Sequence, residues 1–249
     1  MIYVKSHHPS GTVAYISANR IRYNEFFDGI EQLRVPEGTA LAKSILYNAA
    51  RNRNEVAGMM KGEWILFLDD DHVWDPNLLL NLLDRNVDIV TPPYCRRYPP
   101  FETVAFSCYH PDKPFCKLNR EEHVWTLHKW EDFNPPFAPT GLLEVESCGF
   151  GAVLVRKRVL ESLETAFGRP FFRVGAYDPS WGLSSLVKDE MQEDLSFCWA
   201  ARKAGFKVYL DLDQWLGHMT EVKLIATRDK VGKFRVMANI DGYSQWITQ

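Results

Sequence analysis

Three adjacent aspartates, Asp69, Asp70 and Asp71, follow the apolar run WILFL, which spans Trp64 to Leu68. If this run is a buried strand that continues through the aspartates, Asp69 and Asp71 point to one side of the sheet and Asp70 to the other. Carboxylates this close repel one another unless a cation neutralises them, and hard oxygen ligands favour Mg²⁺ or Mn²⁺. The triplet therefore indicates a divalent metal site. The alternative is an acidic turn that caps the next helix.

Strands and helices must alternate around the triplet to position it. Sequence patterns predict strands at 12–17 and 64–68 and from Asp88, and helices at 23–33, 40–60 and 75–83. The helix at 40–60 is expected because the segment is rich in alanine and poor in β-branched residues. Asp75 and Pro76 suit the N-cap and first position of the helix that follows. This alternation predicts an α/β fold with a mainly parallel, doubly wound sheet. Because ligands of such sheets bind beyond the carboxyl ends of the strands, a metal there would bridge to nucleotide phosphates.

The second half of the chain contains two long irregular segments. Residues 99–139 are rich in proline and aromatic residues and are expected to form an insertion that covers the site. Residues 170–191 lack periodicity over about 20 positions, which makes them a candidate lid. Since no interdomain linker is evident, we expect a single domain over 1–249, with a nucleotide-binding half at 1–95 and an acceptor-side half at 96–249.

Composition excludes several classes of protein. Lysine and arginine total 29 against 32 acidic residues, so the overall charge does not favour nucleic acid or an anionic membrane as partner. The five cysteines are scattered without a CxxC pair, which indicates reduced thiols and a cytoplasmic location. Apolar residues make up 46% of the chain, yet no window reaches the roughly 18 apolar residues of a transmembrane segment.

Two spaced motifs resemble those of GT-A glycosyltransferases of the family 2 type, which transfer a sugar from a nucleotide-sugar donor. The strand end LDDDH with its Asp-Pro helix start resembles the DxD motif of that family. The segment EDLSFCWAARKAGFKVYLDLDQWLGH, Glu193 to His218, is similar to the family's Glu-Asp helix, turn, strand and terminal histidine. YISANR (Tyr15 to Arg20) and ESCGFGAVLVRK (Glu146 to Lys157) extend the likeness over most of the chain. The resemblance implies a GT-A, Rossmann-like sheet with helices on both faces.

The resemblance also implies a donor site that contains a metal ion. Asp69 would contact the donor ribose or the metal, Asp71 would bind the metal, and Asp70 would face the donor. His218 would be a further ligand to Mn²⁺ or Mg²⁺ or to the diphosphate, a role that neutral imidazole suits. A packed histidine is the alternative for His218.

A catalytic base is implied at the start of the second motif. Asp194 resembles the base that in inverting members removes the proton of the acceptor hydroxyl, and Glu193 is the second candidate. Both residues would equally favour the positive N-terminal end of their helix without a catalytic role.

Weaker signals surround these motifs. Guanidinium groups form bidentate contacts with phosphates, so Arg97, beside Arg96, is a candidate for holding the donor, although a solvated pair explains it as well. Gly149 and Gly151 form only a GxG, which indicates a close backbone approach or a β-bulge. The histidines other than His218, His72 among them, lack the spacing of known ligand motifs, and no metal is assigned to them. The candidates for reading the nucleoside are Ser17, Asn19, Arg20 and Arg51.

The sequence thus predicts a metal-dependent glycosyltransferase that transfers a hexosyl or related sugar from a nucleotide-diphospho-sugar to a hydroxyl acceptor, with inversion. A metal-dependent nucleotidyltransferase is an alternative, but it would need a basic, glycine-rich phosphate loop where this chain has YISANR. A non-catalytic sugar-binding or nucleotide-binding module is another, although it has no need of a base. The segment RVPEGTALAKSILYNAARN lacks the acidic motif that reads the base in many GT-A enzymes, so the donor's base stays open.

Overall fold

A computed structural model of the chain describes residues 1–17, 23–46, 48–108, 125–127, 141–174, 192–228, 230–231, 233–240 and 242–246. Asn19, Arg20, most of the expected insertion and residues 175–191 of the expected lid lie outside these ranges.

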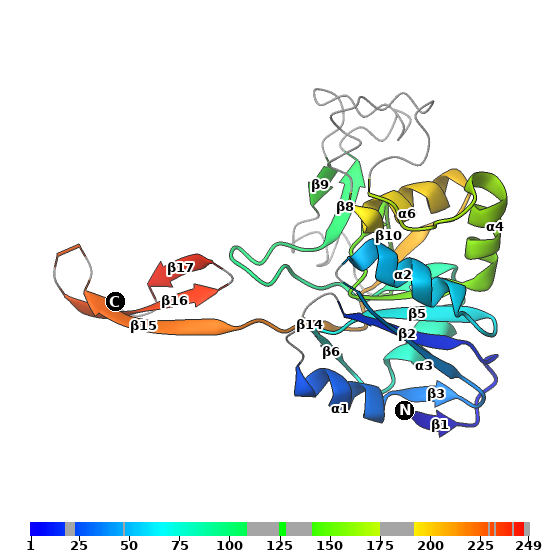
Figure 1. Cartoon of the computed structure of the whole chain (residues 1–249), viewed down its shortest axis with the longest axis horizontal. Coiled ribbons are helices and arrows are strands. Elements are labelled where there is room, and N and C mark those ends of the chain that lie inside the picture. Colours follow the sequence, from blue (N-terminus) through cyan, green and yellow to red (C-terminus); the bar gives the residue numbers. More distant parts are fainter. Residues whose placement is uncertain are drawn as a thin grey trace.

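A seven-stranded sheet forms the centre of an α/β body (Figure 1). Five of its strands run in one direction, whereas β12 and β10 run in the other. The α/β class with a mainly parallel sheet is therefore confirmed, and the antiparallel β12 between β5 and β7 is the main departure from a simple doubly wound order. In spatial order the strands are β10 (Leu142–Val145), β13 (Val208–Asp211), β7 (Ile89–Thr91), β12 (Ala152–Arg156), β5 (Trp64–Asp69), β2 (Thr12–Ser17) and β4 (Ala40–Ile45).

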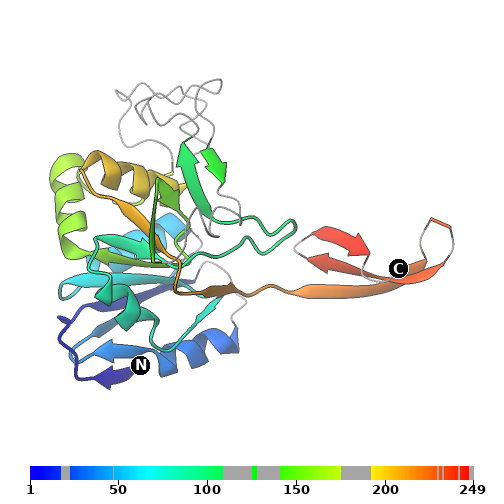
Figure 2. The same cartoon turned by 180° about the vertical axis from the view of Figure 1, so that it is seen from behind.

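Helices cover both faces of this sheet, as expected (Figure 2). Strand β5 is buried on both sides, so its alternate side chains enter two separate apolar cores. Phe67 packs in the core beneath α2 (Ala49–Gly58), α4 (Lys157–Phe167) and α6 (Glu193–Lys203). Leu66 packs in the core beneath α1 (Asn24–Gln32) and α3 (Leu78–Asp84). The strand that ends at the acidic triplet is thus held rigidly from above and below.

The predicted helix at 40–60 is wrong in its first part. Residues 40–45 form the edge strand β4, in which Ala42 and Ser44 are buried and their neighbours are exposed. This period of two matches the sheet and overrides the helix propensity of the alanines. The helix itself, α2, starts at Ala49, where the Asn48 side chain accepts a hydrogen bond from the Arg51 N–H.

The start of α3 also differs from the prediction. The helix begins at Leu78 rather than at Pro76, and its N-cap residue is Asn77. Asp75 still helps to end the preceding loop, since its Oδ1 accepts a hydrogen bond of 2.8 Å from the Asn77 N–H.

Smaller sheets surround the central one. Strand β6 (His72–Trp74) pairs antiparallel with β14 (Leu216–His218), and β1 (Ile2–Val4) pairs with β3 (Arg34–Pro36). A further sheet has the order β11 (Ser147–Cys148), β8 (Ala105–Cys108) and β9 (Trp125–Leu127). The last strands, β15 (Val222–Arg228), β16 (Phe234–Ile240) and β17 (Tyr243–Trp246), form a meander that projects away from the body (Figures 1 and 2).

Candidate functional site

The acidic triplet lies where β5 ends, and the strand does not continue through it. Strand β5 stops at Asp69, Asp70 and Asp71 form a turn, and β6 begins at His72. The expected alternation of a strand therefore does not apply to the three carboxylates. Asp69 turns to a buried arginine, Arg53, whereas Asp71 turns to two histidines.

The pairing of β6 with β14 builds a cluster of Asp71, His72 and His218. His72 and His218 are direct cross-strand partners, and their rings stack with centroids 4.3 Å apart. The Asp71 carboxylate lies 2.8 Å from His72 Nδ1 and 3.3 Å from His218 Nε2. One ligand atom from each of the three side chains lies within 4.8 Å of the others. The turn and one strand pair thus bring together the ends of both motifs.

The tautomer of His218 follows from its backbone contact. His218 Nδ1 lies 2.8 Å from the Cys95 carbonyl oxygen, which can only accept a hydrogen bond. Nδ1 therefore carries a proton, and Nε2 faces the Asp71 carboxylate. Two electron-rich groups in this position require a proton or a cation between them. Burial lowers the pKa of His218, but the neighbouring Asp71 outweighs it and the net pKa is raised.

The pKa of Asp71 reflects the same pairing. Burial alone would raise the pKa of this carboxyl, but the hydrogen bond with His218 and the close approach of His72 hold it well below its usual range. Arg97 adds a positive charge, since its Nη1 lies 3.3 Å from Asp71 Oδ2. Asp71 is thus a carboxylate that stays ionised, as a metal ligand must.

His72 is a member of this cluster that sequence analysis missed. Its side chain is 2% exposed, and neither ring nitrogen has a hydrogen-bond partner among the described residues. The 2.8 Å approach of Nδ1 to Asp71 Oδ1 lacks the alignment of a hydrogen bond. Buried polar atoms without partners are rare, and two imidazoles beside a carboxylate form a donor set that fits a divalent transition metal. The available signal was the position of His72 directly after the triplet.

Gly149 and Gly151 shape the wall beside the histidines. A Cβ atom at Gly151 would lie 2.5 Å from His72 Nε2, and one at Gly149 would lie 2.1 Å from the Tyr94 hydroxyl. The Gly151 N–H donates a hydrogen bond of 3.2 Å to that same hydroxyl. The GxG motif thus provides a close backbone approach, here to His72 and Tyr94.

Replacing Gly151 with alanine is expected to displace His72 and weaken binding of Mn²⁺ to the cluster. Overpacking at such a contact costs about 1–3 kcal/mol of folding free energy. The matched control is Gly58→Ala, because a Cβ there meets only Arg169 Nη1 at 3.9 Å. Calorimetric titration with MnCl₂ measures the affinity. Equal affinity in both variants would show that His72 does not help to hold the ion.

Arg53 is a second residue that sequence analysis missed. The side chain is 4% exposed, and its Nη2 donates to both carboxylate oxygens of Asp69 at 2.9 Å. Its Nη1 donates to Glu193, at the start of α6. Burial lowers the pKa of Arg53, but the carboxylates of Asp69, Glu193 and Asp194 outweigh it and keep the group charged. Arg53 therefore ties the strand that carries the triplet to the helix that carries the candidate base.

Arg53 engages the carboxylates of two residues that the sequence assigned to the site, Asp69 and Glu193. Asp69, expected near the ribose or the metal, is engaged by the guanidinium and is not part of the metal-type cluster. Burial raises the pKa of Asp69, and the charge of Arg53 opposes this. Glu193 is likewise engaged. The signal for Arg53 was its place on the buried side of α2, in line with Ala50 and Ala57.

Asp194 is the better placed of the two candidate bases. Its Oδ1 accepts a hydrogen bond of 2.7 Å from the Leu195 N–H at the beginning of α6. Burial raises the pKa of Asp194 to about 6, the nearby Arg53 opposes this, and Glu193 adds to it. A carboxylate with a pKa near the working pH is suited to accept a proton. The helix start thus presents a carboxylate of raised basicity, while the adjacent glutamate holds Arg53.

The other predicted donor residues are distributed unevenly. Ser17 is buried at the end of β2, and its side chain hydrogen-bonds Asp70. Burial raises the pKa of Asp70, whose Oδ2 has no partner among the described residues. Arg97 reaches Asp71, as described above. Arg51 is exposed, and none of the described contacts links its side chain to the aspartates.

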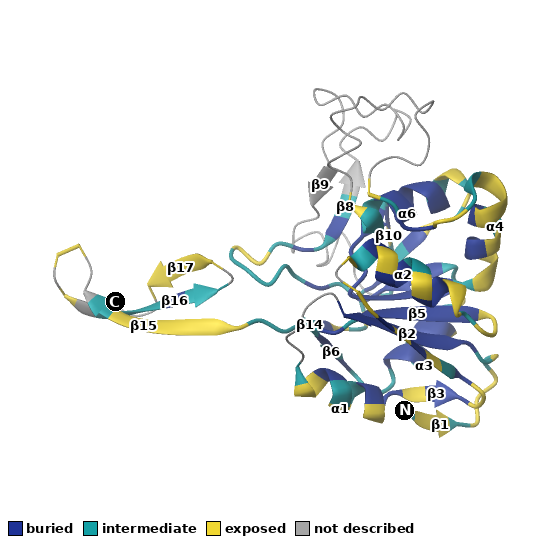
Figure 3. Cartoon of the chain, viewed as in Figure 1, coloured by how far each residue is buried: buried dark blue, intermediate teal, exposed yellow. Residues whose placement is uncertain are grey.

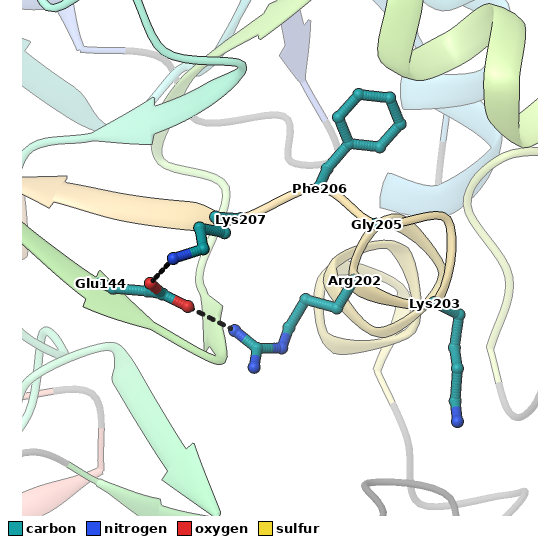
Figure 4. A pocket seen from close by; sticks show the side chains of 6 residues that line it. All are labelled: Glu144, Arg202, Lys203, Gly205, Phe206 and Lys207. Atoms are coloured by element: carbon teal, nitrogen blue, oxygen red, sulfur yellow. Dashed lines mark hydrogen bonds and ion pairs between the residues drawn. The ribbon is translucent and has the colours of Figure 1, made fainter.

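A shallow pocket of about 310 Å³ lies away from this cluster, at the opposite end of α6 (Figure 4). The Glu144 carboxylate lines this pocket and forms ion pairs with Lys207 at 2.7 Å and with Arg202 at 3.6 Å. Its lining residues are Glu144, Arg202, Lys203, Gly205, Phe206 and Lys207.

The fold and the cluster define a class: an α/β protein with a carboxylate and histidine site at the carboxyl end of a central strand. Residues 46–162, which include the triplet, match the model of glycosyl transferase family 2. The resemblance to this family is thereby confirmed over these residues, which include the first motif but not the second, and the match supports glycosyl transfer as the general activity.

Further comparisons add less. The crystal structure of A197 from STIV aligns with a TM-score of 0.48 and 14% sequence identity, over 96% of this chain and 94% of that one. No curated protein matches the chain. In the described part of the chain, no helix is both long and apolar enough to span a bilayer.

Proposed function

We propose that the protein is a metal-dependent glycosyltransferase that transfers a hexosyl or related sugar from a nucleotide-diphospho-sugar to a hydroxyl acceptor. The observation that carries this proposal is the cluster of Asp71, His72 and His218. Asp71 and His72 belong to the segment that matches family 2, and the fold brings His218 next to them. When bound there, a divalent cation would offset the negative charge that grows on the diphosphate leaving group. The two imidazoles favour Mn²⁺ over Mg²⁺ as that cation.

The chain's own residues then divide the remaining work. Asp71, His72 and His218 hold the cation, and Arg97, 3.3 Å from Asp71, is placed to contact donor phosphate. Asp70, which has one buried oxygen without a described partner, and Ser17, its hydrogen-bond partner, are proposed to face the donor. Asn19, Arg20 and Arg51 remain candidates for reading the nucleoside.

Asp194 is proposed as the general base of an inverting displacement. It would accept the proton of the acceptor hydroxyl at Oδ1 or Oδ2 while that oxygen attacks the anomeric carbon. Arg53 contributes by orienting the start of α6, since it holds Glu193 and Asp69 together. Glu193 as base would first have to break its pairing with Arg53, so it is the weaker candidate.

Incubation with a panel of nucleotide-sugars, each with Mn²⁺ or with EDTA, tests this function. We expect slow, Mn²⁺-dependent release of nucleoside diphosphate from one donor even without acceptor, because water can replace the acceptor hydroxyl. Release of pyrophosphate from nucleoside triphosphates would instead identify a nucleotidyltransferase. Binding without any turnover would identify a non-catalytic module.

A further inference from the structure

The meander β15–β16–β17 is a three-stranded sheet with one predominantly apolar face. In antiparallel pairs, directly opposite residues lie on the same face. The register places Leu224 opposite Ala238, which lies opposite Gln245, and places Val222 opposite Ile240, which lies opposite Tyr243. Of the eight positions on this face whose side chains the structure describes, seven are apolar: Val222, Leu224, Ala226, Val236, Ala238, Ile240 and Tyr243. The other face alternates with it and is mixed, with the polar residues Lys223, Thr227, Arg235, Asn239 and Ser244 and the apolar residues Ile225, Met237 and Trp246.

This apolar face is largely open to solvent. Leu224 is 66% exposed, Tyr243 52% and Val222 49%, and Figure 3 shows β17 and most of β15 as exposed. The middle strand β16 is intermediate, and its Ala238 is buried. Neither of the two apolar cores includes a residue of β15, β16 or β17. One contact to the body is the stacking of Tyr243 on Tyr98, with ring centroids 4.8 Å apart. A sheet is normally stabilised by burying its apolar face against another layer, and the described residues supply no such layer.

The charge of the meander differs from that of the rest of the chain. Residues 222–246 contain five basic and two acidic residues, a formal net charge of +3. The whole chain carries −3, which leaves −6 for the remainder. Lys230 and the 85% exposed Val231 lie at the tip of the β15–β16 hairpin, with Lys233 close by. The meander is therefore basic and apolar, although the chain as a whole carries a net negative charge.

We propose that this face docks onto an anionic lipid surface. Aliphatic side chains and an exposed tyrosine suit the boundary of acyl chains and headgroups, and the basic tip suits anionic headgroups. A second copy of the meander is disfavoured as the occupant, because each copy carries a net charge of +3 and two stacked copies would repel one another. Docking by the meander would hold the α/β body beside the membrane with its donor site free.

Flotation of the full-length protein with vesicles tests the proposal. We expect binding to vesicles of phosphatidylcholine mixed with phosphatidylserine, much weaker binding to phosphatidylcholine alone, and weakening of binding by added salt. Lys230→Gln and Lys233→Gln should each weaken binding about fivefold, the effect of about one basic residue near an anionic surface. Leu224→Asp should abolish it.

Strand β4 offers matched controls. Lys43→Gln and Leu41→Asp make the same changes at exposed positions of another edge strand, and both variants should bind as wild type. Wild-type melting temperatures would show that each variant folds. Absence of flotation, or flotation equally strong with phosphatidylcholine alone, would overturn the proposal. So would a concentration-dependent dimer that Leu224→Asp dissociates and that binds no vesicles, since a second copy would then cover the face.

Discussion

Replacing Asp194 with asparagine is expected to lower the turnover of sugar transfer by about 10²–10⁴-fold, the usual contribution of a general base. Asparagine keeps the shape of the side chain and can still accept from the Leu195 N–H through its Oδ1, but it cannot take a proton at neutral pH. The KM for the donor should change little, because Asp194 lies outside the metal-type cluster. Steady-state kinetics with the donor found in the panel measures both parameters.

The same residue predicts a pH profile. In the wild type, turnover should rise through about pH 6, where Asp194 loses its proton, and then reach a plateau. Glu193→Gln is the control, and it should keep an acid limb that is shifted to lower pH, because the charge of Glu193 helps to raise the pKa of Asp194. Full activity of Asp194→Asn, or an unchanged acid limb in that variant, would exclude Asp194 as the base.

Asp194→Asn should lower turnover but raise the free energy of unfolding. The pKa of Asp194 is about 6 in the folded protein against an ordinary 3.8, so the folded state binds the proton more tightly. Ionisation of Asp194 therefore destabilises the fold. This cost grows as the pH rises from about 4 to about 6 and is fully present above that range. Asp194→Asn removes this cost and should stabilise the protein at neutral pH by up to about 3 kcal/mol.

Replacing Arg53 with methionine is expected to destabilise the fold by about 3–5 kcal/mol, because it leaves the Asp69 and Glu193 carboxylates unpaired in a buried setting. Arg53→Lys should cost less, since it keeps the charge but loses the planar fork that reaches both carboxylates. Denaturant unfolding at neutral pH gives the free energies of unfolding.

The control for Arg53 stands two positions earlier on the same helix. Arg51 is exposed, so Arg51→Met should change the free energy of unfolding by no more than about 0.5 kcal/mol. Similar stability of the Arg53→Met and Arg51→Met variants would contradict a structural role of the guanidinium. It would also remove the physical link proposed between the triplet and α6.

Patterns with strong local signals were predicted correctly. The strand at Thr12–Ser17 and the strand that begins at Trp64 form because their mainly apolar runs are buried on both faces of the sheet. The helix around Phe26 and Ile30 forms because its apolar spacing coincides with the buried side. Residues 40–45 were predicted wrongly, since pairing of β4 with β2 outweighs the helix propensity of alanine. The antiparallel course of β12 depends on long-range pairing, for which local periodicity carries no signal.

The two motifs named residues of the candidate site, whose roles remain predictions, but they gave no signal for the contacts among them. Asp71 and His218 meet because β6 pairs with β14, a contact between residues far apart in the chain. His72 and Arg53 were missed because their only signals, a place directly after the triplet and a place in line with buried alanines, match no known ligand motif. The single domain over 1–249 and the lid at 170–191 remain predictions.

The metal-bridged donor site is tested by thermal stabilisation with nucleoside diphosphates, each with and without Mn²⁺. The proteins compared are the wild type, Asp71→Asn and the exposed control Asp28→Asn. A ligand at a hundredfold its Kd adds about 2.7 kcal/mol, which corresponds to roughly 5–10 °C for a chain of this size. We expect one diphosphate to raise the melting temperature of the wild type and of Asp28→Asn only when Mn²⁺ is present. Asp71→Asn should show no shift. Stabilisation that is independent of Mn²⁺, or that survives in Asp71→Asn, would contradict a metal-bridged donor site at Asp71, His72 and His218.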